Sequence, residues 1–312
     1  MISPYTWRLI LLSVACYFLL SVGLRLMVNS LAPFCIRTAE RMQARAAAMA
    51  LFALGIAPFA IAASLVLAVC APSYLLFEPD APHEKAGWLC MGLSTLGFIT
   101  LSSSLFRGVR ALGASIRHAR KLQTAALPRV IAGSHRVLLI DSDVPVLAVI
   151  GVFRSHLVVS RAVLETLSPL QLSAALRHEE AHVESRDNLK RLIMLCVAPK
   201  RLQEAWARIT ERAADDTAAG ESERRRLDLA EALVRFAKIP MAPPPPLVTA
   251  FASDASDLAL RIDRLVGSGI SGAAPRLRIP ALMFLLSACT LVVVYGLDSL
   301  HTVHQALEHL VR

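Results

Sequence analysis

The chain has 312 residues, and its composition of 55% hydrophobic and 18% charged residues is too apolar for an ordinary soluble domain, so it indicates a membrane protein. Its formal net charge of +9 would suit nucleic acid or a membrane surface. The basic residues gather beside apolar runs and no nucleic-acid-binding motif is present, so we expect contact with the lipid bilayer and no direct nucleic-acid binding.

Four apolar runs are long enough to cross a bilayer, which requires about 20 apolar residues. The first run lacks a basic leader and a small-residue cleavage site, so we predict a membrane span there rather than a signal peptide. Within the third run, the segment GLSTLG (92–97) predicts close packing of helices through small residues. The four predicted spans cover about residues 9–28, 46–71, 88–106 and 280–297.

The charged residues between the runs predict the orientation of the chain. Basic residues dominate the link between the first two runs and the segment after the third, whereas the link between the second and third runs is acidic. The positive-inside rule therefore places the first link and the segment 107–279 in the cytoplasm, with both termini outward. We expect a multi-pass protein of the bacterial inner membrane. The basic residues are Arg37, Arg41, Arg45, Arg107, Arg110, Arg117, Arg120 and Lys121, and the acidic ones are Glu78, Asp80 and Glu84.

This topology divides the chain into three parts. A membrane domain with three spans covers 1–107, a cytoplasmic domain covers 108–278, and the last part, 279–312, holds the fourth span and a short outward tail. The middle part is long enough for a core of its own. Its segment LIMLCVA (192–198) is too short to cross a membrane, so we expect it either in that core or at the membrane surface.

The middle part combines strands with helices. Apolar, β-branched runs at 135–143 and 145–160 predict two or three short strands. Ser168 followed by Pro169 predicts the start of a helix, and a second helix is expected over 200–219. The fold class is therefore a mainly α membrane protein with four transmembrane helices and an inserted α+β domain.

The segment RHEEAH, which begins at Arg177, carries the residue types that chemistry needs. His178 and His182 are four apart and lie on one face of the predicted helix, where both imidazoles can reach one zinc ion. Glu179 lies about 100° around the helix from His178, whereas Glu180 lies about 200° away. This H-E-x-x-H pattern is typical of zinc peptidases, in which the glutamate accepts a proton from the attacking water. A charged helix face is the alternative interpretation.

The third ligand distinguishes the classes of zinc peptidase. The metzincin pattern is excluded because Ser185 and Asn188 stand where it requires a glycine and a histidine. A glutamate on a later helix remains. Glu211 is favoured because Asp215, four residues on, could accept the other ring N–H of a liganding histidine. Glu204 is the rival, and simple surface pairing of Glu211 with a neighbouring arginine stays open.

The run LSPLQLSAALRHEEAHVESRDNL, followed by ERAAD, resembles the membrane metallopeptidases of the BlaR/MecR type. It is also similar to their relatives, the HtpX and CAAX-prenyl protease group, and the likeness includes the preceding VIGVFRSHLVVSRAVLETL. The resemblance implies a zincin-like domain of the gluzincin type with one Zn²⁺, held by His178, His182 and Glu211. It also implies Glu179 as the catalytic base and Asp215 as the partner of a liganding histidine.

Two features outside the motif bear on this resemblance. The segment LRIDRL is similar to one that the related peptidases carry, which implies that Arg261 lies near the site, although the His-Pro often found upstream is replaced here by FASDASD. BlaR/MecR proteins carry an outward penicillin-binding sensor domain, whereas DSLHTVHQALEHLVR follows the fourth span here. No S-x-x-K or K-T-G motif is present, so direct acylation by β-lactams is not supported.

By this resemblance, we expect an integral-membrane zinc endopeptidase. It would cleave a cytoplasmic regulator, such as a winged-helix transcriptional repressor, or a membrane protein in signal-controlled proteolysis. A quality-control or processing protease for membrane proteins is the second hypothesis, and a receptor or scaffold that keeps the zinc site without cleaving is the third. In the cleaving cases, a protein or peptide substrate would add as a strand beside residues 146–160, because pairing at a sheet edge recognises backbone.

Overall fold

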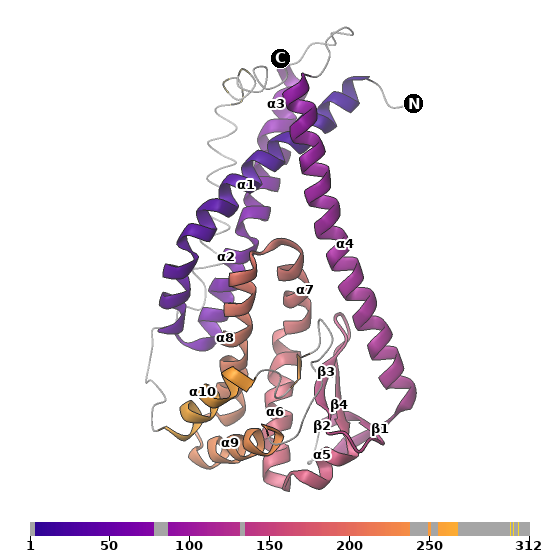
Figure 1. Ribbon diagram of the computed structural model, residues 1–312, viewed down its shortest axis with the longest axis vertical. Helices are drawn as coiled ribbons and strands as arrows, with labels where there is room; N and C mark the ends of the chain where they lie inside the picture. The colour runs from indigo at the N-terminus through magenta and orange to yellow at the C-terminus, as the bar shows by residue number, and fades with distance from the viewer. Residues whose placement is uncertain are drawn as a thin grey trace.

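The computed structural model describes residues 4–77, 87–131, 135–237, 249–250 and 255–267, together with Leu300, Thr302 and Gln305. Long helices form the narrow end of the molecule, and a small sheet with shorter helices forms the wide end (Figure 1). The lower halves of the long helices run alongside the wide end, so the two parts share packing surfaces.

Three helical segments among the described residues are long and apolar enough to cross a membrane, and each contains one of the first three predicted spans. The predicted fourth span, over 280–297, lies outside the described residues. Ser73 donates a hydrogen bond to the carbonyl oxygen of Leu300 at 3.0 Å, so Leu300 lies at the narrow end. The segments lie in α1 (Pro4–Glu40), in α2 (Ala44–Leu65) with the π-helical η1 (Val66–Cys70) and α3 (Ala71–Phe77), and in α4 (Trp88–Ala125).

Helices α1 and α4 continue well past the predicted spans. Helix α1 ends at Glu40 rather than near residue 28, and α4 ends at Ala125 rather than near residue 106. One face of each inner half packs on protein, because Ala39 packs with residues of the shorter helices and Ala119 packs on the sheet. The apolar pattern reports the length that can cross a bilayer, whereas the helix itself continues wherever tertiary packing stabilises it.

Small residues bring α1 and α4 close together, as the segment GLSTLG predicted. A Cβ atom on Gly97 would lie 2.6 Å from Val14 Cγ1 and 2.9 Å from the Val14 carbonyl oxygen. Ser94 Oγ donates to the carbonyl oxygen of Leu11 at 2.7 Å. Close backbone approach and a serine hydrogen bond are the means by which apolar helices associate in lipid.

The five strands form a mixed sheet in the order β1-β2-β4-β3-β5, in which β2 and β4 are parallel and the other neighbours are antiparallel. The predicted strands are confirmed as β2, β3 and β4. Strand β1 was not predicted, because Pro128 weakens a strand pattern, and β1 is an edge strand, where proline is tolerated. The bounds are β1 Ala126–Ile131, β2 His135–Ile140, β3 Leu147–Ile150, β4 His156–Ser160 and β5 Thr249–Ala250.

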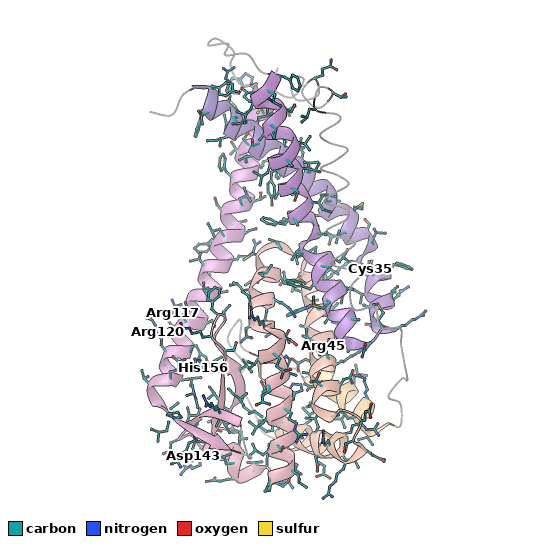
Figure 2. All side chains as sticks on the ribbon, turned by 180° about the vertical axis from the view of Figure 1, so that it is seen from behind. Cys35, Arg45, Arg117, Arg120, Asp143 and His156 are labelled. Atoms are coloured by element: carbon teal, nitrogen blue, oxygen red, sulfur yellow. The ribbon has the colours of Figure 1, made fainter. Side chains whose placement is uncertain are left out.

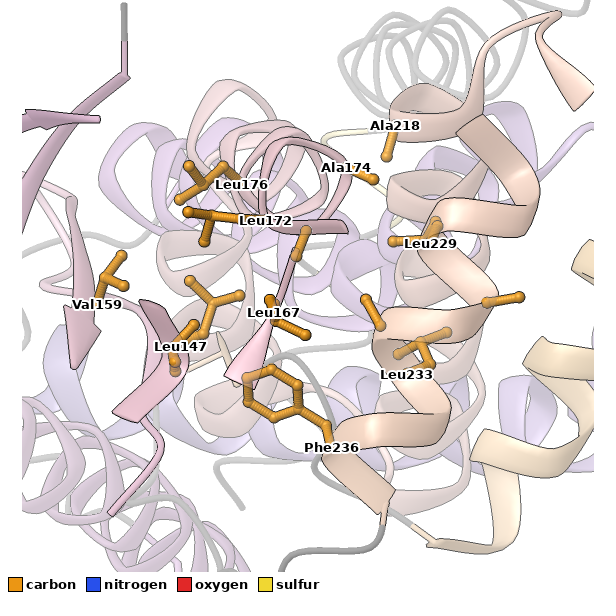
Figure 3. Packing of buried hydrophobic residues seen from close by; sticks show 14 of the residues in the cluster. Leu147, Val159, Leu167, Leu172, Ala174, Leu176, Ala218, Leu229, Leu233 and Phe236 are labelled. Carbon is orange, nitrogen blue, oxygen red and sulfur yellow. The ribbon is translucent and has the colours of Figure 1, made fainter. Parts of the chain in front are cut away.

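Helix α6 (Pro169–Ser185) begins where the sequence predicted. Ser168 Oγ accepts the backbone N–H of Gln171 at 3.3 Å, and Gln171 Oε1 accepts that of Ser168 at 3.0 Å, which completes a capping box. Short helix α5 (Arg161–Thr166) links it to the sheet, and α9 (Glu223–Ala237) packs on α6, with α10 (Ala255–Val266) packed on α9. Figure 3 shows the core between them, which includes Leu147, Val159, Leu172, Leu176, Leu229, Leu233 and Phe236.

Helices α7 (Asp187–Val197) and α8 (Lys200–Ala219) form a hairpin whose tip lies beside α2 and α4. Met194 is buried against α2, where a Cβ atom on Gly55 would lie 2.6 Å from its sulfur. Met194 of the segment LIMLCVA therefore lies in the protein core. Trp206 of α8 packs against Phe52 of α2 with ring centroids 6.5 Å apart, so the membrane-length helices and the hairpin share one core.

Candidate metal centre

Helix α6 buries three residues of the H-E-x-x-H motif on one face. His178 and Glu179 are 0% exposed and His182 is 2% exposed, which is unusual for residues that could be charged. The Nε2 atoms of the two histidines lie 3.2 Å apart, so both rings aim at one point. Glu180 is half-buried and Glu184 is exposed, as expected from their angles around the helix.

Helix α8 brings Glu211 against both histidines. Its Oε2 lies 3.4 Å from His178 Nε2, and its Oε1 lies 3.6 Å from His182 Nε2. The three side chains each offer a ligand atom, and these atoms all lie within 4.8 Å of one another. The rival Glu204 is not part of this group, because it is exposed and pairs with Lys200 at 3.6 Å.

The spacing of these atoms fits a small divalent cation. Nitrogen and oxygen ligands bind zinc at about 2.0–2.1 Å, and a tetrahedral arrangement then separates two ligand atoms by about 3.3 Å. The two histidine nitrogens, 3.2 Å apart, lie close to that value, and each has one of the two Glu211 oxygens at 3.4 or 3.6 Å. The buried group His178, His182 and Glu211 could therefore hold a metal ion.

Glu179 is a buried carboxylate whose two oxygens accept no hydrogen bond from any residue that the structure describes. Burial raises its pKa to about 8, although the nearby charge of His182 acts in the opposite direction. An unpaired carboxylate in such a place is costly unless a water or a cation completes the site. Glu179 therefore lies beside the three candidate ligands, and its carboxylate oxygens are available to accept or donate a proton.

Asp215 and Arg261 contact the candidate ligands His178 and Glu211. Asp215 Oδ1 lies 3.0 Å from His178 Nδ1, the nitrogen that faces away from the convergence point. Arg261, from α10, holds Asp215 with two hydrogen bonds, Nε to Oδ2 at 2.9 Å and Nη2 to Oδ1 at 2.7 Å. Its Nη1 also lies 3.1 Å from Glu211 Oε2. Such a bidentate pair fixes both partners, so Arg261 orients two members of the site.

These charges keep the carboxylates ionised. Burial alone would raise the pKa of Glu211, but the charges of His182, Arg261 and His178 outweigh it and hold that pKa well below its usual range. Burial would likewise raise the pKa of Asp215, and Arg261 and His178 lower it instead. The site therefore presents two anionic carboxylates at neutral pH, which attract a divalent cation.

Asp187 is a site residue that sequence reasoning missed. Its Oδ2 lies 2.7 Å from His182 Nδ1, and the residue is 3% exposed. Arg186 adopts the left-handed conformation (φ 53°, ψ 43°) between α6 and α7, and this turn brings Asp187 back toward the histidine. The available signal was an acidic residue at the start of a helix directly after the motif. Both histidines thus have a carboxylate at Nδ1.

Strand β3, beside which we expected a substrate strand to add, is the second strand from one edge of the sheet. The chain's own β5 lies on that edge, with Val149 opposite Thr249 and Ala148 opposite Ala250. A substrate strand would therefore have to replace β5 or pair with the part of the edge that β5 leaves uncovered.

Comparison with known families agrees with this geometry. Residues 131–242 match the family model of Peptidase family M48, and no curated protein matches the chain. The matched segment contains the sheet from β2 to β4 and the helices that carry both histidines, Glu179 and Glu211. The family match implies a metallopeptidase, and the membrane-length helices beside it support a membrane metalloprotease.

Proposed function

We propose that this chain is an integral-membrane zinc endopeptidase of the gluzincin type, with one Zn²⁺ held by His178, His182 and Glu211. One observation carries the proposal: three buried ligand atoms converge within 4.8 Å beside the unpaired carboxylate of Glu179. A structural ion pair would not require two histidines with facing Nε2 atoms. The match to Peptidase family M48 supports the same reaction class.

A bound zinc ion would supply a Lewis acid that polarises the scissile carbonyl group and lowers the pKa of a water molecule. Glu179 accepts the proton of the attacking water at its carboxylate and then transfers it to the nitrogen of the leaving amine. Asp187 hydrogen-bonds His182 Nδ1 at 2.7 Å, and Asp215 Oδ1 lies 3.0 Å from His178 Nδ1, where it would accept the N–H of that nitrogen. This fixes the tautomer in which each Nε2 carries a lone pair toward the cation.

The wide end of the molecule is proposed to face the cytoplasm of a bacterium, with both termini outward from the inner membrane. Figure 2 shows Arg45, Arg117 and Arg120 beside the wide end, where the positive-inside rule places cytoplasmic residues. The metal centre would then lie next to the inner face of the membrane, because α8 packs on α1 and α2.

Signal-controlled cleavage of a cytoplasmic regulator is the role that this architecture favours, as in the BlaR/MecR proteins that the sequence resembles. Trp206 of α8 packs on Phe52 of α2, and Glu211 lies on the same helix. A change in the packing of the membrane helices would therefore reach a residue of the metal centre directly. A winged-helix transcriptional repressor is the substrate that we propose.

The test of the catalytic assignment is Glu179→Gln. Because the base is removed but the ligands remain, cleavage of a general unfolded substrate, β-casein, should fall about 10²–10⁴-fold while zinc content stays equal to wild type. Glu184→Gln, an exposed change on the same helix, is the matched control and should leave cleavage unchanged. Full activity of zinc-loaded Glu179→Gln protein would exclude the proposed mechanism.

A further inference from the structure

Asn188 connects the helix after the motif to the edge of the sheet. It is the second residue of α7 and is 3% exposed. Its Nδ2 donates to the carbonyl oxygen of Val149 at 3.2 Å and to that of Gly151 at 2.9 Å. Both acceptors are carbonyl oxygens, so the NH₂ end of the amide must face them and Oδ1 must face away.

The Val149 carbonyl group belongs to β3, and that of Gly151 follows directly after the strand ends at Ile150. The carbonyl oxygen of Val146 accepts the N–H of Ser160 and so points toward β4. Carbonyl direction alternates along a strand, so Ala148 and Ile150 also face β4, whereas Val149 faces the opposite side. That side is the edge on which β5 lies. Asn188 therefore binds the edge that a substrate strand would use.

The same short segment also holds a metal-binding histidine. Asp187, the residue before Asn188, contacts His182 Nδ1 at 2.7 Å. Arg186 supplies the turn with its positive φ of 53°, a conformation that costs energy for a residue with a side chain and persists where neighbouring contacts enforce it. Asp187 and Asn188 are consecutive residues, so together they fix the position of His182 relative to the carbonyl groups of Val149 and Gly151.

The carbonyl end of the Asn188 side chain has no hydrogen-bond partner among the described residues. Its Oδ1 is buried and accepts no hydrogen bond from any residue in the described part of the chain. Buried acceptors are rarely left unpaired in proteins, and one that persists beside a candidate site calls for a donor. An extended peptide that pairs with β3 brings backbone N–H groups to this edge, and they are donors of the required kind.

Resting on the proposed peptidase function, we propose that Asn188 is a substrate-positioning residue. Its NH₂ group holds the edge of β3 at a fixed distance from the metal-binding helix, and its Oδ1 accepts a backbone N–H of an extended peptide substrate. The residue acts through β3 and through the peptide backbone, so it sets where the scissile bond lies without a role in proton transfer. Such placement matters because small displacements of a substrate slow catalysis strongly.

The test measures binding in a protein that cannot cleave. In a zinc-loaded Glu179→Gln background, Asn188→Asp keeps the shape of the side chain but removes both donated hydrogen bonds. Affinity for fluorescein-labelled β-casein, followed by fluorescence anisotropy in detergent, should fall about tenfold or more. Zinc content should stay equal. In the Glu179 form, Asn188→Asp should raise KM for β-casein more than it lowers kcat.

Asn188→Ala provides a second variant without a buried charge, in case the aspartate impairs folding, and should weaken casein binding similarly. Gln203→Glu is the matched control, because Gln203 also donates its amide to a backbone carbonyl, that of Ala198 at 2.8 Å, away from the site. Unchanged casein affinity in both Asn188 variants would overturn the inference alone. Loss of zinc together with affinity would also overturn it, since Asn188 would then maintain the metal centre. A wild-type protein that neither binds nor cleaves casein would overturn the proposed function as well.

Discussion

At the scale of single residues, the acids around the motif fall into distinct environments. Glu179 is buried without a hydrogen bond, Glu184 is exposed, and Asp187 is buried against His182. The sequence alone distinguishes Glu179 from Glu184, because helical periodicity fixes the direction in which each side chain leaves the helix. Asp187 lies beyond the end of that helix, and its direction depends on a backbone turn that no side-chain pattern specifies.

Replacement of Asp187 by alanine should weaken zinc binding. The carboxylate orients the His182 ring and selects the tautomer with a free Nε2, and loss of such a partner typically lowers metal affinity about 10–100-fold. Competition for zinc with a chelator on the purified protein measures this. Asp263→Ala, an exposed change on α10, should leave affinity unchanged. If Asp187→Ala binds zinc as tightly as wild type, Asp187 has no part in the site.

At the scale of elements, helix α4 extends beyond the apolar run from which it was predicted. The apolar run in α4 ends near residue 106, yet the helix continues to Ala125 with Ala111 and Ala119 packed against the wide end. Small residues on one face of α4 also permit its contact with α1. Spacing of glycines alone does not show which of them contacts a neighbour, since Gly92 and Gly97 lie in one short segment.

Gly97→Ala should destabilise the helix bundle, whereas Gly92→Ala should not. The added Cβ at Gly97 would meet the Val14 carbonyl oxygen at 2.9 Å, and backbone cannot move aside cheaply, so we expect a cost of roughly 1–3 kcal/mol. Nothing lies within 4 Å of a Cβ at Gly92, where alanine gains about 0.5–1 kcal/mol of helix propensity. Thermal unfolding in detergent micelles compares the two, and equal midpoints would contradict this contact.

At the scale of the whole molecule, one core joins the membrane-length helices to the helices of the candidate metal centre. Leu51 of α2, Met194 of α7 and Trp206 of α8 belong to the same buried cluster. The sequence predicted a membrane part and an α+β part as separate regions, and it did not predict that they share a core. In the sequence, a hydrophobic residue of a membrane-length helix that packs on α7 or α8 cannot be distinguished from one that faces lipid.

Cysteine labelling tests the proposed topology. In a variant without native cysteines, Glu84→Cys, in the acidic link outside the described residues, should react with a membrane-impermeant maleimide in intact spheroplasts. Glu221→Cys, exposed beyond the end of α8, should react only after the membrane is permeabilised. Labelling of Glu221→Cys in intact spheroplasts would place the wide end outward and contradict the proposed orientation.

The sequence by itself determined the features that depend on near neighbours along the chain. Apolar run lengths predicted four spans, and the first three lie in membrane-length helices of the described residues. Capping residues predicted the start of α6, and a spacing of four placed His178 and His182 on one face. These follow from bilayer thickness and helix geometry, which act locally. Only the tertiary structure decided which distant residues join them. Glu211 rather than Glu204 lies against the histidines, Arg261 holds Asp215, and β5 pairs with β3. Each of these contacts depends on how separate elements pack. Packing is set by the whole core rather than by any one segment, so no local pattern predicts it.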